Sequence, residues 1–72
     1  MIRVNAPLKR DYIIELLNHQ TIDGITFTFE KQDGMRLYFN HDGEAERAAI
    51  VAKKTIKSSE FGVAMYFNTE VV

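Results

Sequence analysis

The sequence predicts an α+β domain in which two helices cover one face of a four-stranded antiparallel sheet, and two observations lead to this class. Residues 1–30 and 35–68 both follow the order strand, helix, strand, so the chain repeats one half-domain. Apolar and polar residues alternate in the segments assigned to strands, whereas apolar residues recur every three or four positions in the segments assigned to helices. Two such units with right-handed crossovers, interleaved in one sheet, place both helices on the same face.

The first half contains a strand, a helix and a second strand. Residues 2–5 alternate and form the first strand. We expect a helix over 7–18, because Pro7 is favoured in a first helical turn and an apolar stripe at helical spacing follows it. Residues 19–24 are expected to form a turn, and the strict alternation of 25–30 predicts the next strand. The stripe of the helix comprises Leu8, Tyr12, Ile13, Leu16 and Leu17.

The loop before the strand over 35–40 follows from which side chains must share a face. A two-residue turn at Asp33-Gly34 would set apolar side chains opposite charged ones. A three-residue loop over 32–34 avoids this conflict, with Gly34 in the left-handed conformation of a bulged turn. The expected pairs are Phe29 with Leu37, Phe27 with Phe39, Thr28 with Tyr38, and Glu30 with Arg36.

The second half repeats the pattern after a turn over 40–43. A helix is expected over 43–57, with acidic residues in its first turn and lysines in its last, which complements the helix dipole. Its apolar stripe is rich in alanine, so the helix can lie close to the sheet. A last strand is expected over 61–68, and residues 69–72 either extend it or fray. The stripe comprises Ala45, Ala48, Ala49, Ala52 and Ile56.

These elements predict a single domain over 1–72, the ferredoxin-like βαββαβ sandwich, with the strands in the spatial order 4-1-3-2. One face of the sheet packs against the helices, and the other is left open. The core face is expected to hold Ile2, Val4, Ile25, Phe27, Phe29, Leu37, Phe39, Val63, Met65 and Phe67. The open face carries Arg3, Asn5, Thr26, Thr28, Glu30, Arg36, Tyr38, Asn40, Ala64, Tyr66 and Asn68.

The composition excludes several kinds of function. With no cysteine, the chain has neither disulfides nor thiolate metal sites. Nine basic and ten acidic residues are scattered without runs of one sign, whereas nucleic-acid binding normally shows as a basic excess. The N-terminal segment is too short and too polar to be a signal peptide. No apolar segment of the chain approaches the ~18 residues that a membrane-spanning helix needs. A cytoplasmic location without membrane contact is expected.

No catalytic or metal-binding constellation is evident. His19 and His41 each stand alone in a polar turn, without the spacing of metal ligands. The acidic residues over 42–46 suit a helix cap and first turn, and Ser58-Ser59 has no basic residue in register to activate a hydroxyl. The first loop lacks the arginine and glycine with which acylphosphatases of this topology cradle phosphate. We therefore expect no enzymatic activity, no metal and no other cofactor.

The open face is the candidate binding surface. Tyrosine and arginine are enriched at protein interfaces. A chain of 72 residues buries only ~60–65% of its unfolded surface, so association that covers a further face would stabilise it. We expect a non-catalytic interaction module that forms a homodimer or binds a protein partner through this face or an edge strand. The candidate binding residues are Arg3, Asn5, Thr28, Arg36, Tyr38, Asn40 and Tyr66.

Two alternatives use other chemistry. The tyrosines of the open face could stack the bases of a single-stranded nucleic acid, with its arginines near the phosphates. The RNA-recognition motif has this topology, but of its aromatic signature the strand over 35–40 offers only Tyr38. The second alternative is a small-ligand-sensing regulatory domain. The run over 4–8 is similar to the strand and proline turn that open ACT domains, although the glycine of that turn is absent.

Overall fold

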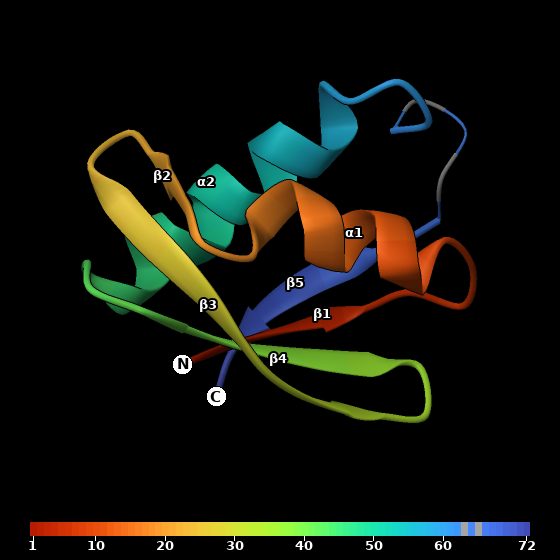
Figure 1. Ribbon diagram of the computed structural model, residues 1–72, viewed down its shortest axis with the longest axis horizontal. Coiled ribbons are helices and arrows are strands. Elements are labelled where there is room, and N and C mark those ends of the chain that lie inside the picture. The colour runs from red at the N-terminus through yellow and green to blue at the C-terminus, as the bar shows by residue number, and fades with distance from the viewer. Residues whose placement is uncertain (63, 65) are drawn as a thin grey trace.

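Figure 1 shows the structure, a computed structural model that describes residues 1–62, 64 and 66–72. The strands of the described residues make one antiparallel sheet of five, in the order β2-β3-β4-β1-β5. The predicted α+β class, with helices packed on an antiparallel sheet, is confirmed. Along the described chain the elements are β1 (Ile2–Asn5), α1 (Arg10–Leu17), β2 (Gln20–Ile22), β3 (Ile25–Asp33), β4 (Arg36–His41), α2 (Ala45–Lys57) and β5 (Asn68–Val71).

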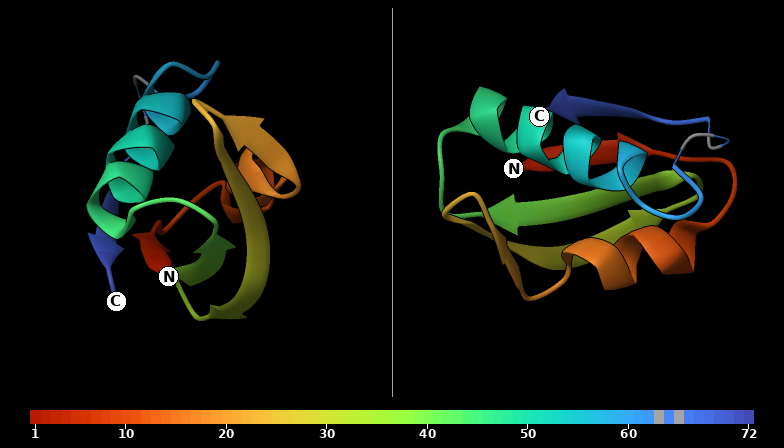
Figure 2. Two further views of the ribbon diagram at one scale, coloured as in Figure 1. Left: turned by 90° about the vertical axis from the view of Figure 1, so that its left-hand side faces the viewer. Right: turned by 90° about the horizontal axis from the view of Figure 1, so that it is seen from above.

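The helices α1 and α2 lie on the same face of the sheet, as the view from the helix side in Figure 2 (right) shows. α2 packs over β1 and β5, and α1 packs over β2 and β3. The chain begins in β1 and ends in β5, which are antiparallel neighbours, so the N-terminus and the C-terminus lie close together (Figure 1). No described helix lies on the opposite face.

The core lies between the helices and the sheet and is built from alternate residues of the strands. Phe27 and Phe39 are its largest fully buried side chains, and burial of each contributes about 1.5–3 kcal/mol. Ala48, Ala49 and Ala52 of α2 are buried, and their small side chains let the helix approach the sheet. Of the predicted core residues, Ile2, Val4, Ile25, Phe27, Leu37 and Phe39 are buried, Phe29 and Phe67 are partly buried, and Val63 and Met65 lie outside the described residues.

The fifth strand, β2, lies where the sequence predicts only a turn over 19–24. β2 and β3 form a hairpin whose turn is Asp23-Gly24, with φ of 51° and 80°. Positive φ at both central residues is typical of a type I′ turn, which the sequence Asp-Gly favours. The run Thr-Ile-Asp-Gly-Ile-Thr over 21–26 is symmetric about this turn, so identical residues pair across it. The expected turn over 19–24 is therefore too long, because residues 20–22 form a strand and the hairpin turn is confined to Asp23-Gly24.

The hairpin between β3 and β4 also differs from the predicted three-residue loop. Its two-residue turn is Gly34-Met35, with a φ of 62° at Gly34, where a type II′ turn requires positive φ. Glu30 forms a bulge, because the register shifts between Phe29 and Lys31. The extra residue that keeps the apolar side chains on one face thus lies within β3, and not in the loop. For this reason the four predicted pairs are wrong. The observed pairs are Phe27 with His41, Thr28 with Asn40, Phe29 with Phe39, Lys31 with Tyr38, Gln32 with Leu37, and Asp33 with Arg36.

The first helix, α1, begins at Arg10, three residues later than predicted. Ala6 is fully buried and donates its N–H to the carbonyl of Met35 at 2.9 Å, so the chain stays bound to the sheet past the end of β1. Lys9 then takes a left-handed φ of 60° just before the helix. Leu8, which the periodicity places in the core, is 70% exposed because it precedes the helix.

The last strand, β5, covers Asn68–Val71, so it extends past residue 68, whereas the described residues of 61–67, expected in the strand, precede it. After α2 the chain crosses the end of that helix, where a Cβ atom on Gly62 would lie 2.1 Å from the carbonyl oxygen of Ile56. This close crossing takes up chain length before the strand can start. Tyr66, expected in a strand on the open face, therefore precedes β5.

Candidate interaction surface

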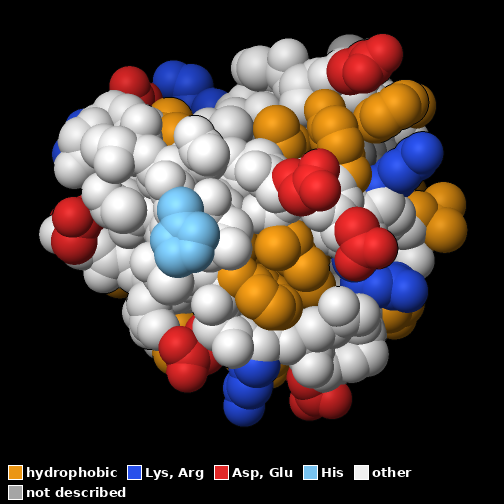
Figure 3. Space-filling view, viewed as in Figure 1, with side chains coloured by type: hydrophobic (Ala, Val, Ile, Leu, Met, Phe, Trp, Pro, Cys, Tyr) orange, Lys and Arg blue, Asp and Glu red, His pale blue; other side chains and the backbone are white. Residues whose placement is uncertain are grey.

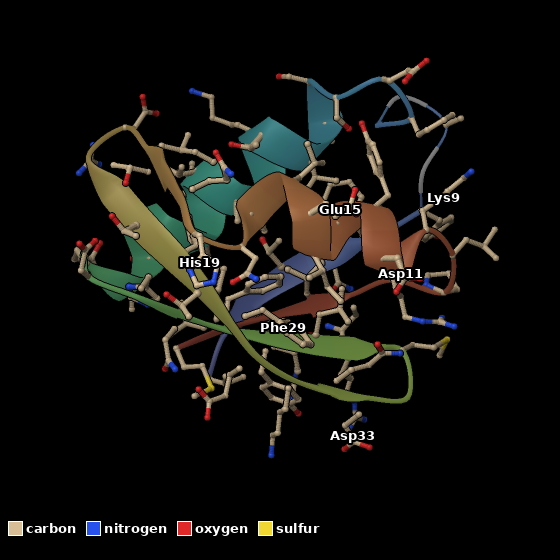
Figure 4. All side chains as sticks on the ribbon, viewed as in Figure 1. Lys9, Asp11, Glu15, His19, Phe29 and Asp33 are labelled. Carbon is tan, nitrogen blue, oxygen red and sulfur yellow. The ribbon has the colours of Figure 1, made fainter. Side chains whose placement is uncertain are left out.

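The open face is the side of the sheet turned away from α1 and α2. In Figure 4 Asp33 points to this side, below β4, whereas Phe29 lies between β4 and α1. Cross-strand pairing arranges the side chains of the face in rows that run across the strands. They are Thr28, Lys31 and Asp33 of β3, Arg36, Tyr38 and Asn40 of β4, Arg3 and Asn5 of β1, and Asn68 and Glu70 of β5.

The middle row consists of Lys31, Tyr38, Arg3 and Glu70, in that order across β3, β4, β1 and β5. The Lys31 Nζ atom lies 5.0 Å from the centroid of the Tyr38 ring, which is a cation–π contact. The Arg3 Nη2 atom donates to Glu70 Oε2 at 2.7 Å. The two contacts hold Lys31 against Tyr38 and Glu70 against Arg3.

The end row consists of Asp33, Arg36, Asn5 and Asn68, and it is joined to the middle row through Asn5. The Asn5 Nδ2 atom donates to Asn68 Oδ1 at 2.6 Å and to Glu70 Oε1 at 2.7 Å. Hydrogen bonding from Arg3 is the main cause that holds the pKa of Glu70 below its usual value, and the charge of Arg3 and the Asn5 hydrogen bond act in the same direction. The carboxylate of Glu70 is therefore ionised and fixed in place at neutral pH.

The charges of the open face balance. Three cations, Arg3, Lys31 and Arg36, stand against three anions, Glu30, Asp33 and Glu70. Glu30 belongs to the face because its carboxylate accepts a hydrogen bond from the side chain of Asn40. Among the described residues only Arg3 and Glu70 form a salt bridge, so the exposed Arg36 guanidinium has none.

Tyr66 lies beyond the rows of the open face, because it precedes β5. It is 87% exposed and lines a groove of about 540 Å³ at the end of the sheet. Asn5 and Arg36 belong both to this groove and to the open face, while Pro7 and Met35 supply apolar walls. The structure thus brings six of the seven predicted binding residues together on the open face and places Tyr66 beyond its edge.

Exposed apolar side chains gather at the same end of the molecule, at the upper right of Figure 3. Leu8 and Phe61, which are 70% and 39% exposed, line a small hollow of about 190 Å³ together with Tyr66. The Phe61 ring packs edge-on against Tyr12 with centroids 5.1 Å apart, and the Lys9 Nζ atom lies 4.3 Å from its centroid. A cation and a neighbouring ring therefore already cover part of Phe61.

The histidines do not behave alike. His19 is exposed, with a left-handed φ of 62°, whereas His41 ends β4 and pairs with Phe27 and so does not stand in a turn as predicted. Both ring nitrogens of His41 are shielded from solvent without a hydrogen-bond partner among the described residues. In residues 1–62, 64 and 66–72, no three His, Cys, Asp or Glu residues lie close enough to hold a metal ion. None of the described helices has the length and apolarity needed to cross a membrane.

Three members of the open face, Lys31, Asp33 and Glu70, are not among the residues expected there. The first two face this side because of the bulge in β3, and Glu70 belongs to the face because β5 extends past residue 68 to Val71. One expectation from the sequence points to the last of these, because an extension of the predicted last strand past residue 68 places Glu70 on the same face as Asn68.

Comparison of the chain with protein-family models, with curated proteins and with solved structures gives no match. The role of the open face is therefore inferred from its own side chains.

Proposed function

We propose that this chain is a small, non-catalytic interaction module of the ferredoxin-like type, which acts in the cytoplasm and binds a second copy of itself or another protein through the open face. The order of β3, β4, β1 and β5 in the sheet supports the ferredoxin-like arrangement, with β2 as an added edge strand. The proposal for binding depends on the middle row.

The observation that carries the proposal is the fixed position of Tyr38 and Arg3 side by side at the centre of an uncovered sheet face. Tyrosine and arginine are the residue types that, with tryptophan, dominate the energy of protein interfaces. Lys31 contacts Tyr38 from one side, and Glu70 pairs with Arg3 on the other. Side chains that are already held lose little conformational freedom when a partner binds, so more of the contact energy remains as affinity.

The balance of charge favours a protein partner over a nucleic acid. Sheets that bind single strands combine a positively charged groove with several stacking rings. The open face has as many anions as cations, and Tyr66 does not stand beside Tyr38. A protein surface with mixed charges of its own is the better match.

A small-ligand site is a second candidate, and the groove beside Tyr66 favours it. Arg36 supplies a guanidinium and Tyr66 a ring, against the apolar walls of Pro7 and Met35. This combination suits a small molecule with a carboxylate and an apolar body. A thermal-shift screen with amino acids and nucleotides tests this candidate, and unchanged melting temperatures throughout would exclude it.

Size-exclusion chromatography with light scattering over a concentration series tests the main proposal. We expect Tyr38→Ala to weaken self-association or binding of a protein partner. Ile50→Ala is the matched control, because it removes an exposed apolar side chain from α2, on the other side of the molecule, and should change nothing. A strict monomer whose Tyr38→Ala variant binds every candidate protein as the wild type does would remove the proposal.

A further inference from the structure

We propose that the open face docks onto the open face of a second copy of this chain, about a two-fold axis that runs parallel to the strands between β1 and β4. This inference rests on the proposed function and names its partner. In this dimer Lys31 faces the partner's Glu70, and Tyr38 faces the partner's Arg3.

The order of side chains in the middle row points to this partner. From β3 to β5 the row reads cation, aromatic ring, cation, carboxylate. A two-fold axis parallel to the strands, through the middle of the row, sets the row of one copy against the partner's row in the opposite order. The first position then faces the partner's fourth, and the second faces the partner's third. Each ammonium then meets a carboxylate and each guanidinium meets a ring face, and symmetry repeats both contacts.

The end row is compatible with the same axis. Arg36 comes to lie opposite the partner's Asn5, and Asp33 opposite the partner's Asn68. A guanidinium thus meets an amide that can accept, and a carboxylate meets an amide that can donate. Within these two rows no charge faces another of the same sign.

Other two-fold arrangements fit less well. A two-fold axis that runs along the middle row, across the strands, would set Lys31 on the partner's Lys31. Like charges that face each other across an interface weaken binding. An axis in the plane of the face, across the strands and between the two rows, would pair Lys31 with the partner's Asp33, but it carries Thr28 and Asn40 past the β3–β4 turn of the partner. The axis along the strands overlays the middle and end rows without this overhang and therefore buries more surface.

The open face is small for an interface. Its rows hold ten side chains, on strands about 4.8 Å apart and in rows about 7 Å apart, which gives a footprint of about 340 Å² per copy, or about 700 Å² in total. Stable complexes usually bury about 1,200–2,000 Å². The dimer is therefore weak and concentration-dependent, and it weakens further at high salt because its contacts are charged and partly exposed.

Charge reversal followed by mixing tests this docking. In the dimer, Lys31→Glu sets two carboxylates against each other at both ends of the middle row, and Glu70→Lys sets two ammonium groups there. In sedimentation equilibrium each variant alone should dissociate about tenfold more readily than the wild type. An equimolar mixture should regain the wild-type dissociation constant to within about threefold, because every new charge then faces an opposite one.

Two further variants secure the result. Lys53→Glu makes the same charge change at an exposed position of α2 and should leave the dimer unchanged. Glu70→Lys also removes the salt bridge to Arg3, so its folding is checked by circular dichroism, and Glu70→Gln replaces it if needed. Mixed with Lys31→Glu, the Gln variant should regain part of the affinity, because one of the two ion pairs across the interface is intact.

Three results would overturn the docking: a dimer that withstands Lys31→Glu, a mixture that stays monomeric, or recovery with Asp33→Lys in place of the Glu70 variant. Each of these results is compatible with self-association of the wild type. The proposed function would then stand, but the two copies would bind through other contacts. A wild-type chain that is monomeric at every concentration overturns both the docking and self-association, and leaves only the binding of a different protein.

Discussion

Arg3 and Glu70 lie opposite each other on β1 and β5, with the guanidinium Nη2 atom 2.7 Å from the carboxylate Oε2 atom. The pair joins the first strand of the chain to the last. On the open face it has two effects, because it ties the edge strand β5 to the sheet and fixes one half of the middle row.

Stability in acid should depend on Glu70. The hydrogen bond from Arg3 keeps the pKa of Glu70 below its ordinary value of 4.5, so the folded protein binds fewer protons than the unfolded chain. This stabilisation is present above pH 4.5 and is lost as the pH falls through the lower pKa of the folded state. In urea unfolding from about pH 3 to pH 7, the wild type should lose more stability toward acid than Glu70→Gln does. Parallel pH profiles would contradict this role.

The N-cap of α2 gives a second prediction. The Glu44 carboxylate accepts hydrogen bonds from the backbone N–H groups of Glu46 at 3.1 Å and of Arg47 at 2.9 Å. Glu44→Ala should lower the free energy of unfolding, because it leaves these donors without a partner. Glu46→Ala removes an exposed carboxylate from the same turn and should cost less. Equal losses in denaturant unfolding would mean that the cap does not stabilise the helix.

The close crossing after α2 gives a third prediction. A Cβ atom on Gly62 would lie 2.1 Å from the carbonyl oxygen of Ile56 and 2.5 Å from that of Lys57, and backbone atoms cannot rotate aside. Gly62→Ala should therefore destabilise the fold by about 1–3 kcal/mol, as overpacking does elsewhere. Ser58→Ala, at an exposed position near the same helix end, serves as the control in thermal unfolding. An unchanged Tm for Gly62→Ala would show that the chain does not cross there.

The start of α1 gives a fourth prediction. Leu17 is fully buried, whereas Leu8 precedes the helix and is 70% exposed. Leu17→Ala should cost about 2–5 kcal/mol, while Leu8→Ala should stay within about 0.5 kcal/mol of the wild type. Denaturant unfolding of both variants measures the difference. A large loss for Leu8→Ala would return this residue to the core, where the helical periodicity places it.

Local patterns in the sequence account for much of the fold. The alternation in β1 and β4 is visible because one face of each strand is buried, which requires apolar residues at every second position. The alanine stripe and charged ends of α2 likewise place it over 43–57, close to its observed extent of Ala45–Lys57. Six of the seven predicted binding residues lie on the open face for the same reason.

What depends on distant contacts could not be predicted. The bulge at Glu30 is set by how β3 pairs with β4, and several registers satisfy the same alternation. The late start of β5 follows from the passage of Gly62 against the end of α2, which no local pattern encodes. Both differences act on the candidate site, because the bulge decides which face Lys31 takes and the extent of β5 decides whether Glu70 belongs to the sheet.

A dilution series followed by NMR tests most directly whether the open face of one copy docks on that of another. We predict that backbone amide signals of β1 and β4 shift with protein concentration, most strongly around Arg3 and Tyr38, while those of α2 stay constant. Concentration-dependent shifts confined to Leu8, Phe61 and Tyr66 at the apolar end, or to α2, would contradict it.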